Sequence, residues 1–372
     1  MNNLTDPVNI ILQIQKIDIL KIFLPTVVSF TAGMLITPFI TNMMIRFNLQ
    51  KVRNVKHTVD GKTATLTAKI HNDENKVLYR MGALVALFGF FTAVAIFRIL
   101  PALIDSDTLA QLNFLSRSQT RMPLAALILG MIVGAVDDLM VCGRLKKFAH
   151  YVGDGLSLRI RLGFALIIAL ASAWWMTDKL DMSSFYIPFI GTFQVSWILF
   201  TVAVVAAIMI TYAGSVIDGI DGLSGGIFSI MFSTFGFIAF VEQRFDLAAF
   251  CFAIVGGLLA FLWFNIPPAR FMLSDIGSMP LTIVLAIVAI LTDSLFVLPI
   301  ISLPLVTAIG SVVLQLLSKK FRGKKLIPIS PMHNSLIYIG WPPSKVVMRY
   351  WIITALCSVI GFVVFVSGGY FG

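Results

Sequence analysis

Residues 246–264 read DLAAFCFAIVGGLLAFLWF, a run whose only charged residue is the first. A helix needs about 20 mostly apolar residues to cross the hydrocarbon core of a bilayer. The same pattern recurs along the chain, and ten such stretches are found in all. The ten predicted spans are residues 21–45, 79–104, 122–139, 160–177, 196–213, 223–241, 246–264, 279–293, 295–317 and 350–371. The sequence therefore predicts an all-α polytopic membrane protein with about ten transmembrane helices.

Composition agrees with this fold class. Of the 372 residues, 58% are hydrophobic and 12% are charged, about half the charged share of a soluble domain. No water-soluble domain fits between the spans, so residues 1–372 are expected to form a single integral membrane domain. The longest break, 46–78, is predicted to be a loop with a small hairpin at 63–70. The start MNNLTDPVNI lacks the basic region and cleavage site of a signal peptide, so the first span is expected to be retained.

Basic residues are concentrated in alternate loops. Segments 46–80, 140–161 and 318–349 carry eight, five and seven Lys or Arg residues, while the breaks on the opposite side share five. The positive-inside rule assigns the three basic segments to the cytoplasm, which places both termini outside. The net charge of +10 is thereby explained without nucleic acid, and no nucleic-acid partner is expected.

The first acidic cluster lies at the cytoplasmic end of the third span, where residues 134–139 read GAVDDL. Two adjacent carboxylates, Asp137 and Asp138, are costly at the end of an apolar helix unless they face water, a cation or a base. The alternative is a pair of solvated helix-end acids, with Arg144 and the lysines after it as counter-ions.

The second cluster follows the fifth span and reads SVIDGIDGLSGG over residues 215–226. Asp218 and Asp221 are three residues apart, so on a helix or tight turn they share a face. The glycines around them allow the backbone to approach a ligand and expose N–H groups to phosphate. A glycine-rich connector with solvated acids is the alternative.

Two further clusters complete the set. Residues 264–278 read FNIPPARFMLSDIGS, in which a Pro-Pro break ends the seventh span and places Asn265 and Asp275 on a loop. The basic stretch 319–325 is followed by PMHN, which contains His333. Taken alone, Asp275 is equally compatible with a helix cap, Asn265 with a helix-end amide and His333 with an ordinary loop residue.

The joint placement of these clusters points to one chemistry. Carboxylates on three cytoplasmic loops, with glycines beside them and a basic loop nearby, suit a magnesium–pyrophosphate substrate. Mg²⁺ prefers one or two carboxylates together with substrate phosphates, and cations stabilise the charge of a transferring phosphoryl group.

In this order and spacing the clusters resemble the polyprenyl-phosphate N-acetylhexosamine-1-phosphate transferase family, from about Arg46 to the final span. GAVDDL is similar to the family's Asp-Asp motif and SVIDGIDGLSGG to its Asn-x-x-Asp-Gly-x-Asp-Gly-Leu segment. FNIPPARFMLSDIGS is similar to its Phe-Asn…Phe-Met-Gly-Asp-x-Gly-Ser segment. The ending GWPPSKVVMRYW, residues 340–351, is similar to that of members that use UDP-MurNAc-pentapeptide.

The resemblance implies a ten-helix enzyme of the bacterial inner membrane, with both termini outside and a Mg²⁺-dependent active-site cleft on the cytoplasmic face. The implied reaction transfers phospho-MurNAc-pentapeptide from UDP-MurNAc-pentapeptide to undecaprenyl phosphate, which gives lipid I and UMP. Membrane lipids and, because family members often dimerise, a second copy of the chain are the other expected partners.

Residue by residue, Asp275 matches the family's magnesium ligand. Asp137 and Asp138 match the paired carboxylates tied to catalysis and lipid-phosphate binding, and the resemblance leaves open which of them acts as base. The matches on the substrate side are Asp218, Asp221, Asn265, His333 and, in the first cytoplasmic loop, Lys76, for which Arg80 is the alternative.

The chain departs from the family pattern at several positions. His333-Asn334-Ser335 replaces a cluster of three histidines, and Ser215 replaces the asparagine three residues before Asp218. Ser274 replaces the glycine before Asp275, and of a Gly-Thr-Pro-Thr-Met-Gly-Gly run only Met-Gly remains. These departures keep the metal site but leave room for UDP-GlcNAc as donor or for a paralogue with altered activity. A secondary transporter is the rival from another class, and would place its acids near the bilayer midplane.

Overall fold

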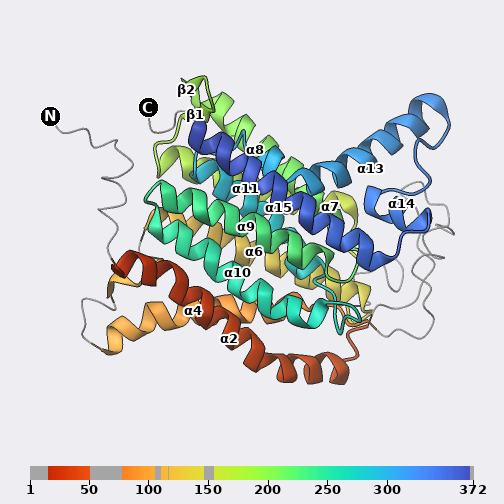
Figure 1. Cartoon of the computed structure of the whole chain (residues 1–372), viewed down its shortest axis with the longest axis horizontal. Coiled ribbons are helices and arrows are strands. Elements are labelled where there is room, and N and C mark those ends of the chain that lie inside the picture. Colours follow the sequence, from red (N-terminus) through yellow and green to blue (C-terminus); the bar gives the residue numbers. More distant parts are fainter. Residues whose placement is uncertain (1–15, 51–77, 105–109, 116, 146–154, 369–372) are drawn as a thin grey trace.

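The computed structural model describes residues 16–50, 78–104, 110–115, 117–145 and 155–368 (Figure 1). Within these ranges, nine helices are long and apolar enough to cross a membrane. They are α2 (Lys16–Arg46), α4 (Ala83–Leu103), α6 (Ser118–Val141), α7 (Leu158–Asp178), α8 (Trp197–Ala213), α9 (Leu223–Val241), α10 (Phe245–Asn265), α13 (Leu303–Arg322) and α15 (Pro343–Ser367). The remaining predicted span, 279–293, corresponds to α11 (Asp275–Leu291), a shorter apolar helix of 17 residues. The prediction of an all-α polytopic membrane protein is confirmed.

The helices run side by side along the molecule, and the two ends of the bundle differ (Figure 1). At one end α2 begins, α15 ends and a small antiparallel hairpin is found, formed by β1 (Ser184–Ile187) and β2 (Gly191–Gln194). We call this the hairpin end. The short helix α14 (Met332–Tyr338) lies at the other end, which we call the α14 end.

Helices α9, α10 and α11 form the centre of the bundle. Every residue of α11 from Ile276 to Leu291 is buried, as expected of a helix that is apolar all round. In the outer helices α2, α13 and α15, less than a third of the most apolar stretch is buried inside the protein. Their exposed side chains are large and hydrophobic, with Leu35 of α2 77% exposed. Such faces are suited to lipid.

Helices α6 and α11 approach each other closely because α6 carries glycines four residues apart. A Cβ atom at Gly130 would clash with Pro280, and one at Gly134 would clash with the backbone of Asp275. Small residues on one face allow the backbones of membrane helices to come together. This contact brings the last turns of α6 beside the first residue of α11.

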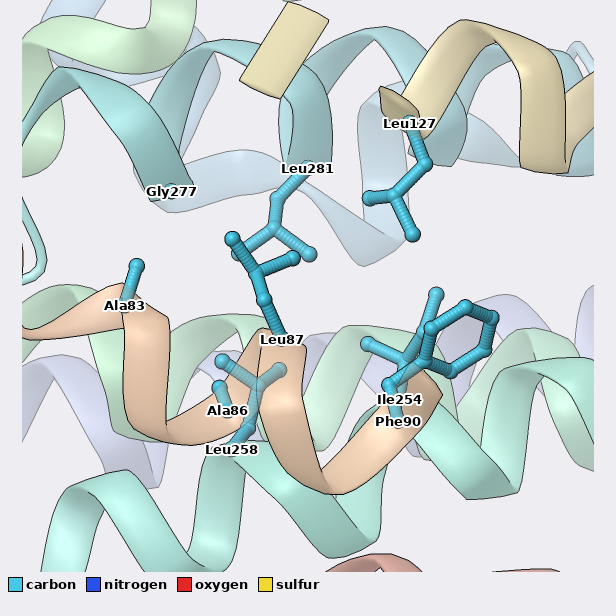
Figure 2. Close-up of a pocket in the computed structure, with 9 residues that line it drawn as sticks. All are labelled: Ala83, Ala86, Leu87, Phe90, Leu127, Ile254, Leu258, Gly277 and Leu281. Atoms are coloured by element: carbon cyan, nitrogen blue, oxygen red, sulfur yellow. The ribbon is translucent and has the colours of Figure 1, made fainter. Parts of the chain in front are cut away.

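Packing in the core leaves one small gap among α4, α6, α10 and α11. Figure 2 shows its lining, which is entirely apolar and includes Leu87, Leu127 and Leu281. The volume is about 10 Å³, the lower limit for a single water molecule, and the lining offers no polar partner. The gap is therefore a small packing defect in the apolar core.

The β1–β2 hairpin was not predicted, because four-residue strands are too short to show an alternating pattern. It pairs Ser184 with Gln194, and it is attached to the end of α15 by the Tyr186 hydroxyl, which donates to Gly368 O at 2.7 Å. The hairpin predicted at 63–70 lies outside the described residues.

Helix α15 begins seven residues earlier than predicted, at Pro343. Proline is accepted in the first turn of a helix, where its missing N–H has no partner to lose. Helix α13 continues past the predicted end at residue 317 to Arg322 and is closed by Gly323 in a left-handed conformation, as is common after the last turn of a helix. The basic run therefore extends α13 beyond its apolar part.

Candidate active site

Three carboxylates meet at the α14 end of the bundle. Asp137 and Asp138 lie in the last turns of α6, and Asp275 is the first residue of α11. One oxygen atom from each lies within 4.8 Å of the other two. The close approach at Gly134 brings these residues together, although about 140 positions separate them in the sequence. The structure thus unites the first and third acidic clusters.

Asp138 is fully buried and held by four contacts. Its Oδ2 accepts the Ile276 N–H at 3.0 Å, and Oδ1 accepts the Asp275 N–H at 3.4 Å. The first N–H groups of α11 have no partner within the helix and lie at the positive end of the helix dipole. A carboxylate is favoured there. Oδ1 also accepts a hydrogen bond from Arg80 Nε–H at 2.8 Å, and Arg80 Nη2 forms an ion pair with the same oxygen at 2.6 Å.

Arg80 bridges two members of the cluster, because its Nη2 also donates to Asp275 Oδ2 at 2.8 Å. Burial by itself would lower the pKa of Arg80, but the adjacent Asp138 and Asp275 outweigh it, and the pKa is raised above its ordinary value. Arg80 therefore stays charged and acts as the main counter-ion of the cluster.

Asp137 has a different environment. It is buried, and its Oδ1 accepts the Leu156 N–H at 2.6 Å. Arg161 of α7 also belongs to the site, with its Nη1 3.9 Å from Oδ1 of Asp275. Compared with Asp138, Asp137 keeps more acceptor capacity for a ligand.

A polar cavity of about 160 Å³ opens beside Asp275. It is lined by Arg80, Arg161, Ser215, Val216, Asp218, Met272, Ser274, Asp275 and Ser278. Two guanidinium groups and two carboxylates thus face one space between the acid cluster and the second acidic segment. Such a space suits a phosphate-bearing group together with a cation.

Asp218 anchors the loop that follows α8. Its Oδ1 accepts the Ser224 hydroxyl and its Oδ2 the Ser274 N–H, both at 2.7 Å. Burial raises the pKa of Asp218 above its ordinary value, while these two hydrogen bonds lower it. Asp221, from the same segment, accepts the Ala269 N–H at 3.4 Å. Both predicted acids therefore join loop 218–222 to the loop that precedes α11.

Asn265 ties the same two loops together. Its Oδ1 accepts the Gly222 N–H at 2.9 Å, and its Nδ2 donates to Phe271 O at 2.8 Å. The side chain is buried, and both ends of the amide are engaged with backbone. In this arrangement Asn265 positions the loops.

His333 is fully buried in α14 and faces loop 218–222. A Cβ atom at Gly219 would lie 3.4 Å from its Nε2, and its ring meets Tyr350 edge-on with centroids 6.4 Å apart. The structure thus places His333 against the second acidic segment. Lys76 lies outside the described residues, so its predicted role stays a prediction.

Three contacts in and beside the site were not predictable from the sequence. In the sequence Arg80 is only the alternative to Lys76, and Arg161 is one of five Lys or Arg residues in segment 140–161. Trp351 of α15 was not singled out, yet its Nε1 donates to Gly222 O at 3.1 Å and its ring fills the space beside Gly226. No local feature of the sequence places Trp351 beside the glycine-rich segment, since more than 120 positions separate them.

The acids occupy helix ends. Asp137 and Asp138 lie within the last five residues of α6, Asp275 begins α11, and Asp218 directly follows the 3₁₀ helix η2 (Gly214–Ile217). A transporter site would draw on broken helices near the middle of the membrane, and this placement argues against it.

Comparison with known proteins gives a consistent result. Residues 121–293, which contain both acidic segments and Asp275, match the model of glycosyl transferase family 4. A phospho-N-acetylmuramoyl-pentapeptide-transferase of Latilactobacillus sakei subsp. sakei is 36% identical over 239 residues, 64% of this chain and 73% of that protein. Proteins of the same name from Rubrobacter xylanophilus and Lactobacillus acidophilus are both 31% identical, over 63% and 62% of this chain and 74% and 69% of their own lengths. The chain therefore belongs to glycosyl transferase family 4, the polyprenyl-phosphate N-acetylhexosamine-1-phosphate transferases that its motifs resemble.

Proposed function

We propose that this protein transfers phospho-MurNAc-pentapeptide from UDP-MurNAc-pentapeptide to undecaprenyl phosphate, forming lipid I and releasing UMP. The observation that carries the proposal is the convergence of Asp137, Asp138 and Asp275 beside a polar cavity at the ends of two apolar helices. The relatives support the choice of reaction, since all three are named phospho-N-acetylmuramoyl-pentapeptide-transferase.

The acid cluster fits a divalent metal of the Mg²⁺ type. Its donors are carboxylate oxygens within 4.8 Å of one another, and Mg²⁺ favours such hard donors together with phosphate oxygens. Asp275 is the proposed ligand, because 23% of its side chain remains exposed beside the cavity, with Asp137 and Asp138 within reach. Bound there, Mg²⁺ would offset charge on the donor diphosphate.

The reaction forms one P–O bond and breaks another. An oxygen of the lipid phosphate attacks the sugar-bearing phosphorus of the donor, and the bridging oxygen leaves with UMP. At pH 7 a phosphate monoester is largely ionised, so the nucleophile requires little activation. We assign acceptance of any remaining proton to Asp137, whose acceptor capacity is less occupied than that of Asp138. Arg161 faces the cavity and provides positive charge for the leaving phosphate.

The loops beside the cavity are assigned to the nucleotide side of the donor. Asp218 lines the cavity, and its two oxygens hold Ser224 and Ser274. Asp221, Asn265 and His333 shape the same loop from outside the cavity. Their proposed role is to fix the shape of the nucleotide site, since pre-positioned groups provide much of the acceleration in phosphoryl transfer.

The proposal includes a location. We place the protein in the bacterial inner membrane as a single integral domain, with the α14 end on the cytoplasmic side and both termini outside. The support is the excess of Lys and Arg in segments 46–80, 140–161 and 318–349. A homodimer stays a prediction, checked by the mass of the detergent-solubilised protein.

Two donors distinguish the proposed reaction from its nearest rival. Purified protein in detergent is given undecaprenyl phosphate, Mg²⁺ and either UDP-MurNAc-pentapeptide or UDP-GlcNAc, and both UMP and lipid product are measured. We expect product from the muramoyl donor and at least 100-fold less from UDP-GlcNAc. The reverse preference would replace the proposed donor while keeping the chemistry.

The same assay tests the acid cluster. Asp275→Asn should lower turnover by at least 10³-fold, since a metal ligand and its charge are lost, without changing the thermal unfolding midpoint by more than a few degrees. Asp178→Asn is the matched control, because Asp178 is an exposed acid outside the site, paired with Lys179. Turnover of Asp275→Asn near that of the control would refute the metal assignment.

A further inference from the structure

The guanidinium of Arg80 occupies carboxylate oxygens that a divalent cation would need. It contacts Asp138 at 2.6 and 2.8 Å and Asp275 at 2.8 Å, and its side chain is only 12% exposed. A bridging arginine and a bridging metal ion therefore draw on the same pair of side chains. The guanidinium and the metal ion cannot both be in full contact with these oxygen atoms at the same time.

The charges around the cluster lead to the same conclusion. Three carboxylates lie together, and two arginines, Arg80 and Arg161, are within 4 Å of them. A divalent ion that arrived while Arg80 stayed in place would share Asp138 and Asp275 with the guanidinium, and the repulsion between two neighbouring positive charges is strong away from water.

The structure also provides a place for the displaced side chain. The backbone at this point is fixed, because the Arg80 N–H donates to Leu49 O at 2.9 Å and the Met81 N–H donates to Ser274 Oγ at 2.7 Å. Displacement must therefore occur by rotation of the side chain. Arg80 lines the cavity of about 160 Å³ beside Asp275, so the guanidinium has room to turn into the space assigned to the diphosphate.

We infer that Arg80 is a built-in competitor of the divalent cation, which weakens metal binding until the guanidinium moves from Asp275 into the cavity. The inference rests on the proposed metal site and concerns its regulation. It assigns Arg80 as a positioning residue with two places: on the carboxylates before the metal binds, and beside the donor phosphates afterwards. Metal and donor are then coupled, because phosphate in the cavity gives the displaced arginine a new partner.

The test measures binding of Mn²⁺ alone to the full-length protein in detergent, by the loss of the free Mn²⁺ signal in electron paramagnetic resonance. Arg80→Gln keeps a polar side chain and removes the charge, and should bind Mn²⁺ at least tenfold more tightly than the unchanged protein. Arg80→Lys keeps the charge and should change affinity by less than threefold. Arg270→Gln removes an exposed arginine near the site that stacks on Phe264, and should have no effect.

A second variant identifies where the ion binds. Adding Asp275→Asn to Arg80→Gln should abolish the gain in affinity. Affinity of Arg80→Gln equal to or below that of the unchanged protein overturns the inference. If Arg80→Gln is unstable without metal, its unfolding midpoint should rise with Mn²⁺ more than that of the unchanged protein. Failure of Mn²⁺ to restore it also overturns the inference.

The result of the Mn²⁺-binding test can be distinguished from the result of the transfer assay that tests the proposed function. Transfer by the unchanged protein without tighter Mn²⁺ binding by Arg80→Gln refutes the role of Arg80 alone. Tighter Mn²⁺ binding without transfer from either donor refutes the proposed reaction and leaves the competition between Arg80 and the cation established.

Discussion

Ser274 adopts a backbone conformation that glycine adopts most readily, with φ 60° and ψ −174°. Residues with a Cβ atom are strained there by about 1–3 kcal/mol. Two of its hydrogen bonds reach distant segments of the chain: its N–H donates to Asp218 at 2.7 Å, and its Oγ accepts the Met81 N–H at 2.7 Å. One residue thus joins loop 218–222, through its backbone, and the segment before α4, through its side chain, to the start of α11. The hydroxyl offsets part of the strain through the bond to Met81.

Two substitutions at Ser274 separate strain from hydrogen bonding. Ser274→Ala keeps the strained backbone and leaves the buried Met81 N–H without its partner, so it should lower the free energy of unfolding by about 1–3 kcal/mol. Ser274→Gly loses the same bond but relieves the strain, and should be more stable than the alanine variant by about 1 kcal/mol or more. Unfolding in detergent, followed by circular dichroism, measures the order. An alanine variant as stable as the glycine variant would contradict the strained conformation.

At the scale of elements, the contact between α6 and α11 determines the geometry of the acid cluster. The backbone of Asp275 packs directly against Gly134, one turn before Asp137 and Asp138. Because the two helices touch backbone to backbone, the Cα atoms of the three acids cannot separate without a shift of one helix against the other. The precision of the site therefore depends on a residue without a side chain.

Gly134→Ala should push the start of α11 away from α6. The added Cβ meets the Asp275 backbone, so we expect a loss of about 1–3 kcal/mol in the free energy of unfolding and at least a tenfold fall in turnover. Gly163→Ala is the matched control, because a Cβ at that position in α7 meets nothing within 4 Å. Alanine there should be neutral or stabilise by up to about 1 kcal/mol. Equal turnover of the two variants would show that the α6–α11 spacing does not control the site.

At the scale of the whole molecule, the basic loops determine orientation. Green fluorescent protein inserted after Gly323, an exposed residue past α13, should fluoresce, since the α14 end is assigned to the cytoplasm. Alkaline phosphatase fused to the C-terminus should be active, since that end is assigned outside. The internal control exchanges the two reporters: alkaline phosphatase inserted after Gly323 should be inactive, and green fluorescent protein fused to the C-terminus should not fluoresce. A non-fluorescent insertion after Gly323 together with an inactive phosphatase fusion would show that the protein has the opposite orientation in the membrane.

The ten spans were predictable because hydropathy is a local property of the sequence, and each span has its counterpart helix in the described residues. The grouping of Asp137, Asp138 and Asp275 was predictable in outline, since all three were assigned to one membrane face. The partners of these acids were not predictable. Which of many cytoplasmic cations turns inward depends on tertiary packing, so Arg80 and Arg161 could not be told from their neighbours. Nothing local in FNIPP shows that the Asn265 amide joins two loops.

The ion pair between Arg80 and Asp138 has a consequence for biogenesis. A membrane protein is synthesised from its N-terminus, so α6 inserts with two carboxylates well before α11 leaves the ribosome. Asp138 follows Arg80 by 58 positions, whereas the α11 residues whose N–H groups cap it come 137 and 138 positions later. The counter-ion of the most deeply buried acid is therefore already present when that acid reaches the translocon, which lowers the cost of inserting α6 before its partner helix exists.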